Sequence, residues 1–469
     1  MHKRLTVVVA LLALLIACVG CGQEVTDTSV TTTTSRSTTG STTGTGKKFS
    51  TIGVPSATLP DGSGGQTPSG GGVFTDDIFA AERLSDIASA PISGALATIN
   101  PLDSAKAVQN GQDLALSVSQ NKIADFEKSI AYCESKGGTP DKMVHVSTFT
   151  IIGDKVYMTY YANPSSNAED PTKQEARFAY CPISDTGKMN IQTVMKVGDE
   201  VDGELITRVY DTILMNKDEN EIYVMWTAST LVQYYRFYRV YNVKTGKMGP
   251  VQVNRFKVGD VTNDFSISGV RHALHASGVQ CKEMSADIGI MQKLSKRVEN
   301  GVTYYYTGAY AGAFNCIIKS RDLVTWEYVA QPSFANQSEF ENSVYVVGSK
   351  VYYFVRQTSS SPYGFLTYYD LTGGKWSAPV LIKDCQSRSD FVYYNNRLFL
   401  IHAPKNRSGF GIVEVGLNKL TDTKAIAVAD MGSSCFYPYV QMYGETAYIS
   451  YTVDRQHIRL STFRLSDYL

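Results

Sequence analysis

The sequence lacks the features on which several classes of protein depend. It has no formal net charge, with 44 Lys and Arg against 44 Asp and Glu, and no basic cluster, so a nucleic-acid partner is not expected. The cysteines beyond residue 22 are Cys133, Cys181, Cys281, Cys316, Cys385 and Cys435. They form no CxxC pair, and no His-rich spacing accompanies them, so no metal site is indicated. Their even number permits disulfides, and burial as small apolar residues is the alternative.

No apolar run is long enough to span a membrane. The longest, LTVVVALLALLIA over residues 5–17, follows Lys3 and Arg4 and has the length and flanks of the apolar part of an export signal. It ends in LIAC, which has the form of a bacterial lipobox. Residues 1–22 are therefore predicted to be a lipoprotein signal, with Cys18 as the lipid-modified residue and Cys21 as the alternative. We expect an extracytoplasmic protein that is lipid-anchored to the bacterial cell membrane or surface, or else an ordinary cleaved signal peptide.

Composition divides the rest of the chain. Residues 23–72 are mostly Thr, Ser, Gly and Pro, which favours a disordered tether. Residues 73–140 are predicted to be a short helical extension. One helix is expected in FTDDIFAAERLSDIASA, with Asp77 as a plausible cap, and another in KIADFEKSIAYCESKGG, which ends in a Gly pair. No second low-complexity linker follows, so residues 141–469 are predicted to form one large unit.

That unit has a repeated strand pattern. An apolar strand, a tight turn with Gly, Asn or Asp, and an aromatic-rich strand recur between Val144 and the C-terminus. The six occurrences are HVSTFTIIGDKVYMTYYA, YDTILMNKDENEIYVMWTA, GVRHALHASG with VTYYYTGAY, ENSVYVVGSKVYYFVRQ, DFVYYNNRLFLIHAP and YPYVQMYGETAYISYT. Repeated hairpins are typical of propeller blades, so the fold class is predicted to be all-β, a six-bladed β-propeller. The 30 tyrosines suit both strands and a sugar-stacking surface.

Two turns and four residues carry a resemblance to a known family. IIKSRDLVTWEYV (317–329) and YYDLTGGKWSAPVLI (368–382) resemble degenerate Asp-box turns. Glu341, Arg356, Arg407 and Tyr437 follow in an order and rough spacing similar to those of the sialidase family. The resemblance spans about Val144 to Leu469 and is better from Ile317 onward.

The resemblance implies a chemistry. In sialidases the nucleophile is a phenol, because a carboxylate would be repelled by the substrate's own carboxylate, and a glutamate takes the phenolic proton. Tyr437 and Glu341 match these roles, with Glu339 as the alternative base. Arg356 and Arg407 match arginines that fork onto a carboxylate. The acid/base aspartate corresponds to Asp170, in a loop that also contains Glu169 and Glu175.

The sequence departs from the family in its first blade. The Arg-Ile-Pro motif expected there reads Val144-His145-Val146-Ser147, so His145 stands where the first substrate-binding arginine is expected. A histidine cannot fork onto a carboxylate as arginine does. Asp211, at the start of a predicted blade, is a further candidate for substrate binding.

The function predicted from these residues is exo-acting glycoside hydrolysis of terminal acidic sugars by a monomer that needs no cofactor. The partners expected are a glycan and a membrane, the latter through the lipid anchor. Two alternatives stay open. One is a propeller hydrolase or lyase acting on a different glycan. The other is a non-catalytic glycan-binding or adhesion propeller.

Overall fold

Strands make up most of the part of the chain that the structure describes. The computed structural model describes residues 96–102, 105–127, 141–187, 189–280, 284, 288–291, 293–311, 314–332, 338–357, 363–385, 387–404 and 407–469. All of them belong to one compact unit, Lys47–Leu469. The predicted signal, Cys18, the tether and the helix expected in residues 74–90 lie outside the described residues.

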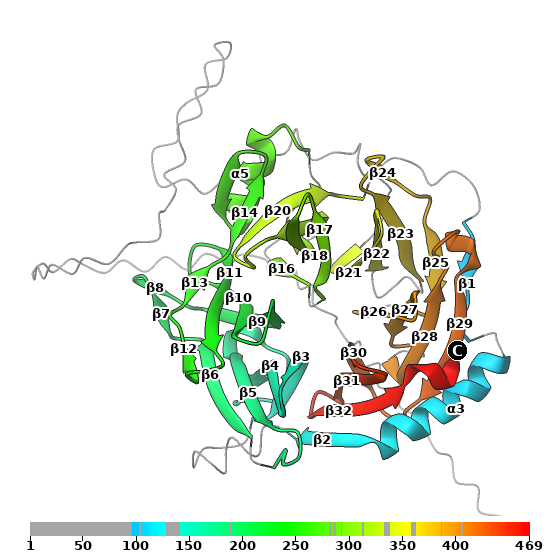
Figure 1. Cartoon of the computed structure of the whole chain (residues 1–469). Coiled ribbons are helices and arrows are strands. Elements are labelled where there is room, and N and C mark those ends of the chain that lie inside the picture. Colours follow the sequence, from blue (N-terminus) through cyan, green and yellow to red (C-terminus); the bar gives the residue numbers. More distant parts are fainter. Residues whose placement is uncertain are drawn as a thin grey trace, which may run out of the picture. The chain divides into compact units, whose positions relative to one another are not determined.

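Six sheets of four or more strands, here named sheets 1 to 6, follow one another around a ring (Figure 1). Sheet 1 contains β3 (Met143–Ile152), β4 (Lys155–Asn163), β5 (Glu175–Pro182) and β6 (Asn190–Lys196). Sheet 2 contains β9 (Arg208–Asn216), β10 (Glu221–Ser229), β11 (Tyr234–Asn242), β12 (Lys247–Met248) and β13 (Gln252–Val253). A two-stranded ribbon, β7 (Glu200–Val201) and β8 (Glu204–Leu205), precedes sheet 2.

Sheet 3 contains β14 (Arg255–Val258), β15 (Val261–Asp264), β16 (Ile288–Ile290), β17 (Ser295–Glu299), β18 (Val302–Ala311), β19 (Phe314–Ser320) and β20 (Thr325–Ala330). Sheet 4 contains β21 (Ser338–Val347), β22 (Lys350–Gln357), β23 (Tyr363–Asp370), β24 (Lys375–Trp376) and β25 (Val380–Lys383), with β1 (Thr98–Ile99) paired parallel to β25. Sheet 5 contains β26 (Asp390–Tyr394), β27 (Arg397–His402), β28 (Gly409–Val415) and β29 (Lys424–Asp430). Sheet 6 contains β30 (Cys435–Tyr443), β31 (Thr446–Val453), β32 (His457–Arg464) and β2 (Lys122–Glu127).

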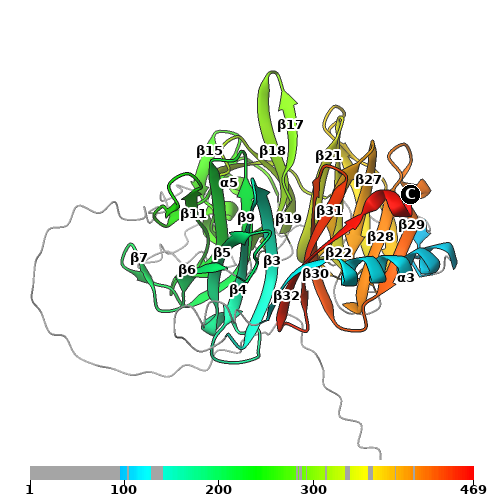
Figure 2. The ribbon, with the colours of Figure 1, turned by 60° about the horizontal axis from the view of Figure 1, so that its bottom comes forward.

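The prediction of an all-β propeller is confirmed, but only five of the sheets are regular blades. In these five the strand nearest the centre is continuous, and its neighbours follow as antiparallel strands. In sheet 3 the corresponding strand is divided into β16 and β17, which both pair with β18. The hairpin of β17 and β18 projects beyond the neighbouring strands (Figure 2).

Two segments differ from the secondary structure predicted for them. Residues 122–127 were expected to be helical, but they form β2, which pairs with β32 and completes sheet 6. The other three strands of that sheet come from the C-terminal end, so β2 covers an edge that would otherwise stay open, and this pairing overrides a weak helical preference. GVRHALHASG, expected to be a strand, lies in the helix α5 (Ile267–Ala276), where the Ser266 side chain accepts the cap hydrogen bond from the Gly269 amide.

The other long helix is α3 (Ala105–Gln120), which packs on β29 and β32. Leu114 and Val118 are buried in the cluster between sheets 5 and 6. Gly111 allows the close approach, because a Cβ there would lie 1.5 Å from the Val428 carbonyl oxygen. The short 3-10 helices are η1 (Pro171–Lys173), η3 (Leu420–Asp422) and η4 (Leu465–Tyr468). Among the described residues, no helix has both the length and the apolar character that a membrane span requires.

Hydrogen bonds tie each sheet to the next near the centre of the ring. Buried Ser, Thr and Asn side chains reach the backbone of the neighbouring sheet, and one Asp accepts from it. The pairs are Ser450 to Ser147, Thr212 to Val146, Thr227 to Ile288, Asn342 to Ala309, Ser343 to Ser389 and the Val440 amide to Asp390. Because every junction between sheets has such a bond, the inner strands are held at fixed positions around the centre.

The two turns that resemble Asp-boxes are pinned by their aspartates. Asp322 accepts hydrogen bonds from the amides of Val324 and Thr325 at 2.8 Å each, and Trp326 is fully buried. Asp370 accepts from the Thr372 amide at 2.9 Å. These residues therefore stabilise hairpin tips.

The four cysteines that the structure describes, Cys181, Cys316, Cys385 and Cys435, are buried. Cys133 and Cys281 lie outside the described residues. Within the described part, no group of three or more His, Cys, Asp or Glu could hold a metal ion.

Candidate active site

The inner strands of four sheets carry an irregularity at a similar place. The strand register shifts in β3, β9, β21 and β30. In three of these strands the bulge contains a residue with left-handed backbone, namely Val146 with φ 53°, Asp211 with φ 50° and Tyr437 with φ 53°. Glu341 lies in the bulge of β21. Bulges re-aim side chains, and left-handed backbone in non-glycine residues persists only when the surrounding packing enforces it. Asp211, Glu341 and Tyr437 are thus brought together from sheets 2, 4 and 6.

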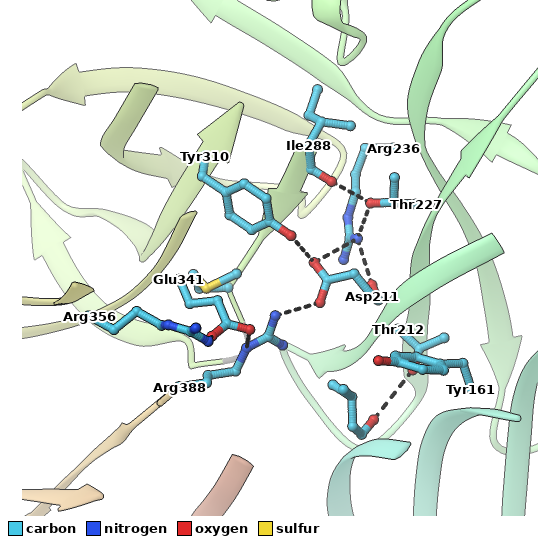
Figure 3. A network of polar contacts seen from close by, with 12 residues as sticks. Tyr161, Asp211, Thr212, Thr227, Arg236, Ile288, Tyr310, Glu341, Arg356 and Arg388 are labelled. Atoms are coloured by element: carbon cyan, nitrogen blue, oxygen red, sulfur yellow. Dashed lines mark hydrogen bonds and ion pairs between the residues drawn. The ribbon is translucent and has the colours of Figure 1, made fainter. Parts of the chain in front are cut away.

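Glu341 is buried between two arginines (Figure 3). Arg356, on the neighbouring strand β22, forms an ion pair with its Oε2. The Nε of Arg388 lies 3.3 Å from its Oε1. Burial opposes ionisation of this carboxyl, but the two guanidinium charges outweigh it and lower its pKa. Glu341 is therefore ionised at neutral pH and faces the phenol as a base.

At Tyr437, in contrast to Glu341, the sum of burial and the neighbouring charges opposes ionisation. Burial raises the pKa of its phenol well above the ordinary value, and the negative charge of Glu341 acts in the same direction. Arg356 and Arg407 oppose this rise without overcoming it. The phenol is therefore protonated at neutral pH and becomes nucleophilic only if a neighbouring base takes its proton, which Glu341 is placed to do.

The sequence reasoning missed Arg388, and also Arg236, Tyr310 and Arg455. Arg388 precedes β26, is buried, and its Nη2 lies 2.7 Å from Oδ1 of Asp211. Its guanidinium also lies over the ring of Tyr437, 4.9 Å from the centroid. The sequence feature that could have identified Arg388 is its position just before an inner strand, because Asp211 and Glu341 also lie near the starts of inner strands.

Asp211 is fully engaged by its neighbours (Figure 3). Besides Arg388, its carboxylate accepts a hydrogen bond from the Tyr310 hydroxyl at 3.0 Å and lies 3.5 Å from Nη1 of Arg236. Gly289 makes room for this arrangement, because a Cβ there would lie 2.5 Å from Oδ2 of Asp211. Asp211 therefore fixes the position of Arg388.

Two further arginines lie over the ring of Phe436, the residue that precedes Tyr437. Arg407, between β27 and β28, stacks its guanidinium 5.5 Å from the Phe436 ring centroid. Arg455, in the turn between β31 and β32, stacks on the same ring at 4.7 Å. Nη2 of Arg455 also lies 2.9 Å from the carboxylate of Glu169.

The loop after β4 presents Glu169 toward the site. Glu169 accepts a hydrogen bond from the Tyr161 hydroxyl, and its charge contributes to the raised pKa of Tyr437. Asp170, the residue favoured from sequence, caps η1 instead and accepts hydrogen bonds from the amide and the hydroxyl of Thr172. Its carboxylate also pairs with Lys173 at 2.9 Å. Glu175, which the sequence placed in this loop, is the first residue of β5 and pairs with Arg177 at 2.5 Å.

His145 is buried beside the nucleophile candidate. Its ring stacks on that of Tyr437, with a centroid distance of 4.8 Å and an interplanar angle of 21°. Burial, followed by the charges of Arg455, Arg407 and Arg388, lowers the pKa of His145 well below its usual value, so the imidazole is neutral.

The side chains around Tyr437 carry an excess of positive charge. The guanidiniums are those of Arg236, Arg356, Arg388, Arg407 and Arg455, and the carboxylates are those of Asp211, Glu341 and Glu169. With His145 neutral, five cations face three anions. Such a cluster favours an anionic ligand.

Comparisons with known proteins give weak structural likenesses. No protein family model matches the sequence. No curated protein matches it either. Trypanosoma rangeli sialidase in complex with sialic acid is 14% identical over 70% of this chain and 56% of its own, with a TM-score of 0.44. A Hadza microbial sialidase is 10% identical over 70% of this chain and 66% of its own, with a TM-score of 0.47.

A protein of unknown function from Dyadobacter fermentans is 13% identical over 73% of this chain and 98% of its own, with a TM-score of 0.46. This chain spans a little over half of the length of the T. rangeli sialidase, at 56%. The functional argument therefore depends on the side chains of this chain.

Proposed function

We propose that this chain is an exo-acting glycoside hydrolase that removes a terminal acidic sugar from glycans, with Tyr437 as nucleophile. The observation that carries the proposal is the Glu341 carboxylate held between Arg356 and Arg388, with the Arg388 guanidinium lying over the ring of Tyr437. The fold proposed for it is a six-bladed propeller in which the irregular sheet 3 counts as a blade. This count is supported by the place of sheet 3 between sheets 2 and 4 in the ring.

The reaction would proceed in two displacements. Glu341 takes the phenolic proton as the oxygen of Tyr437 attacks the anomeric carbon and the glycosidic C–O bond breaks. A carboxylic acid in the loop after β4 gives its proton to the leaving oxygen. In the second displacement its carboxylate takes a proton from the water that attacks the anomeric carbon, and Glu341 returns its proton to the departing oxygen of Tyr437. We assign this role to Glu169 in place of Asp170, because the charge of Glu169 acts on Tyr437, whereas Asp170 caps η1.

The acidic group of the sugar would be held by the arginines around Tyr437. A carboxylate bound there would meet planar guanidinium groups that can each donate two hydrogen bonds. We assign Arg407 and Arg356 to this role, as the sequence predicted. Arg388 joins them, and Arg356 and Arg388 become available once the substrate's charge competes with Glu341 and Asp211 for them.

The test is hydrolysis of a fluorogenic sialoside by the purified chain. We expect turnover that falls at least about 10³-fold in Tyr437→Phe, because the nucleophile is lost. Glu169→Gln should lower turnover by about 10²-fold or more, and Asp170→Asn, its matched control, should change it less than about threefold. Equal loss in both variants would reject the assignment of Glu169.

A non-catalytic glycan-binding propeller is the second candidate. The observation that favours it is that Arg356 and Arg388 already pair with carboxylates of the chain itself. A protein that binds acidic glycans in calorimetry, with affinity unchanged in Tyr437→Phe and with no turnover, would establish this candidate. Turnover of other acidic or neutral glycosides without cleavage of sialosides would instead favour a hydrolase or lyase for a different glycan, consistent with neutral His145.

The proposed location is the outer face of a bacterial membrane, with a lipid on Cys18. This follows from the LIAC sequence at the end of the apolar run. Growth with radiolabelled palmitate should label the wild-type chain and not Cys18→Ala. Label that persists in that variant and disappears in Cys21→Ala would move the anchor to Cys21.

A further inference from the structure

The ring of Tyr437 rests on a neutral aromatic surface supplied by another sheet. His145, on β3 of sheet 1, stacks on Tyr437, on β30 of sheet 6. Tyr161 and Phe436 meet the edges of the His145 ring at centroid distances of 5.6 and 5.5 Å, with interplanar angles of 80° and 83°. His145 is therefore enclosed by three aromatic rings.

The two stacked side chains come from matched bulges. The bulge of β3 begins after His145, and Val146 has a φ of 53°. The bulge of β30 contains Tyr437, whose φ is also 53°. Left-handed backbone in such residues is kept only where packing enforces it. The hydroxyl of Ser450 donates to the Ser147 carbonyl at 3.2 Å and joins the two sheets at this point.

The imidazole makes no polar contact that would explain its burial. Both ring nitrogens of His145 lack a hydrogen-bond partner among the described residues, and the side chain is fully buried. Three guanidiniums, those of Arg388, Arg407 and Arg455, act on it electrostatically. A cationic side chain at this position would be repelled by them, whereas an uncharged ring is tolerated.

We propose that His145 is a positioning residue for Tyr437, acting through its uncharged ring and not through its nitrogens. The inference rests on the proposed function for its catalytic consequence, but the contact itself can be tested without a substrate. The stacked ring limits rotation of the Tyr437 side chain, so that the phenol stays directed toward Glu341. Aromatic pairs contribute about 0.5–1.5 kcal/mol beyond the area they bury, so the expected effects lie between about 2-fold and 10-fold.

The first experiment compares His145→Leu, which removes the ring but keeps an apolar side chain, with His145→Phe, which keeps a ring and removes the nitrogens. Nitration of Tyr437 by tetranitromethane, followed by peptide mass spectrometry, reports how freely the phenol moves. We expect nitration about 3- to 10-fold faster in His145→Leu and unchanged in His145→Phe. A wild-type rate in His145→Leu, or equal acceleration in both variants, would overturn the proposal.

The second experiment measures sialoside turnover by the same variants. In His145→Leu we expect kcat to fall by up to about 10-fold with KM changed less than about twofold, and in His145→Phe we expect kcat to be restored. A rise in KM with unchanged kcat would overturn the positioning role. If no variant and no wild-type chain turns over, the proposed function fails, while the nitration rates still decide whether His145 positions Tyr437.

Discussion

Arg388 and Asp211 form a buried ion pair of 2.7 Å that joins two sheets of the ring. Asp211 lies in the bulge of β9 in sheet 2, and Arg388 immediately precedes sheet 5. Arg388 also lies against Glu341 of sheet 4, so one guanidinium bridges the carboxylates of two sheets. This contact gives the candidate site its shape before any ligand binds.

The first prediction concerns the removal of that bridge. Asp211→Ala leaves Arg388 and Arg236 buried without their shared carboxylate, and breaking a buried ion pair costs about 3–5 kcal/mol. We expect the free energy of unfolding in urea to fall by about that amount. Asp370→Ala, which removes a carboxylate from a hairpin tip, is the control and should cost no more than about 1 kcal/mol. Similar losses in both variants would contradict the bridging role of Asp211.

The second prediction concerns Gly289. A Cβ at this position would lie 2.4 Å from the ring of Tyr310 and 2.5 Å from Oδ2 of Asp211. Gly289→Ala should therefore displace the bond between these two groups and cost about 1–3 kcal/mol of unfolding free energy. Gly187→Ala, between β5 and β6, is the control, because the nearest atom to its added Cβ lies at 3.6 Å and its backbone, like that of Gly289, is not left-handed. If Gly289→Ala costs no unfolding free energy in a chain that already carries Tyr310→Phe, the clash acts through the hydrogen bond between Tyr310 and Asp211. An undiminished cost would show that it does not.

The third prediction concerns the centre of the ring. Lys293 comes from the break between β16 and β17, and its Nζ lies 3.1 Å from Oδ2 of Asp390 in sheet 5. The same ammonium donates to the Val440 carbonyl in sheet 6. Lys293→Met should cost about 3–5 kcal/mol because it leaves Asp390 buried and uncompensated.

Replacing both partners of this pair should recover much of that loss. In Lys293→Met with Asp390→Leu, no uncompensated charge stays buried, so we expect unfolding in urea nearer to wild type than in Lys293→Met alone. Additive losses in the double variant would contradict a direct pairing of Lys293 with Asp390.

The fourth prediction concerns acid stability. Burial lowers the pKa of His402 from 6.5 to about 4. The unfolded chain binds a proton at His402 at a higher pH than the folded chain does. The free energy of unfolding therefore keeps its full value above pH 6.5 and falls as the pH drops toward 4. His402 should contribute about 3 kcal/mol to this loss, and the lowered pKa of His145 acts in the same direction. Urea titrations at pH 7 and 4.5 should show a smaller decline of the free energy of unfolding in His402→Leu than in wild type. An equal decline in both would contradict this role of His402.

The sequence predicted the strand-rich architecture because strand patterns are local. Alternating apolar residues and turn residues lie next to one another in the chain, and each hairpin could be identified from them. β2 could not be identified in this way, because its partner β32 is more than three hundred residues away and residues 122–127 have no strand pattern of their own. The helix α5 was predicted to be a strand because its apolar residues were too few to distinguish the periodicity of a helix from that of a strand.

For the same reason, only part of the candidate site could be predicted from the sequence. Glu341 and Arg356 are neighbours on paired strands, so their relation is visible in the sequence. Arg388 owes its role to Asp211 from another sheet, and no local pattern marks it. Asp170 and Glu169 are adjacent in sequence, and only the cap of η1 shows which of the two carboxylates is occupied by the loop itself.

The pairing of β2 with β32 has a consequence for how the protein acquires its structure. β2 precedes its partner β32 by more than three hundred residues, so sheet 6 cannot be completed until the strands of all the other sheets have been synthesised. Contacts so distant in sequence make folding slow. The arginine, glutamate and tyrosine side chains from sheets 2, 4 and 6 would then converge only at that late step, so a chain interrupted before β32 should hold most of its hairpins and none of its candidate chemistry.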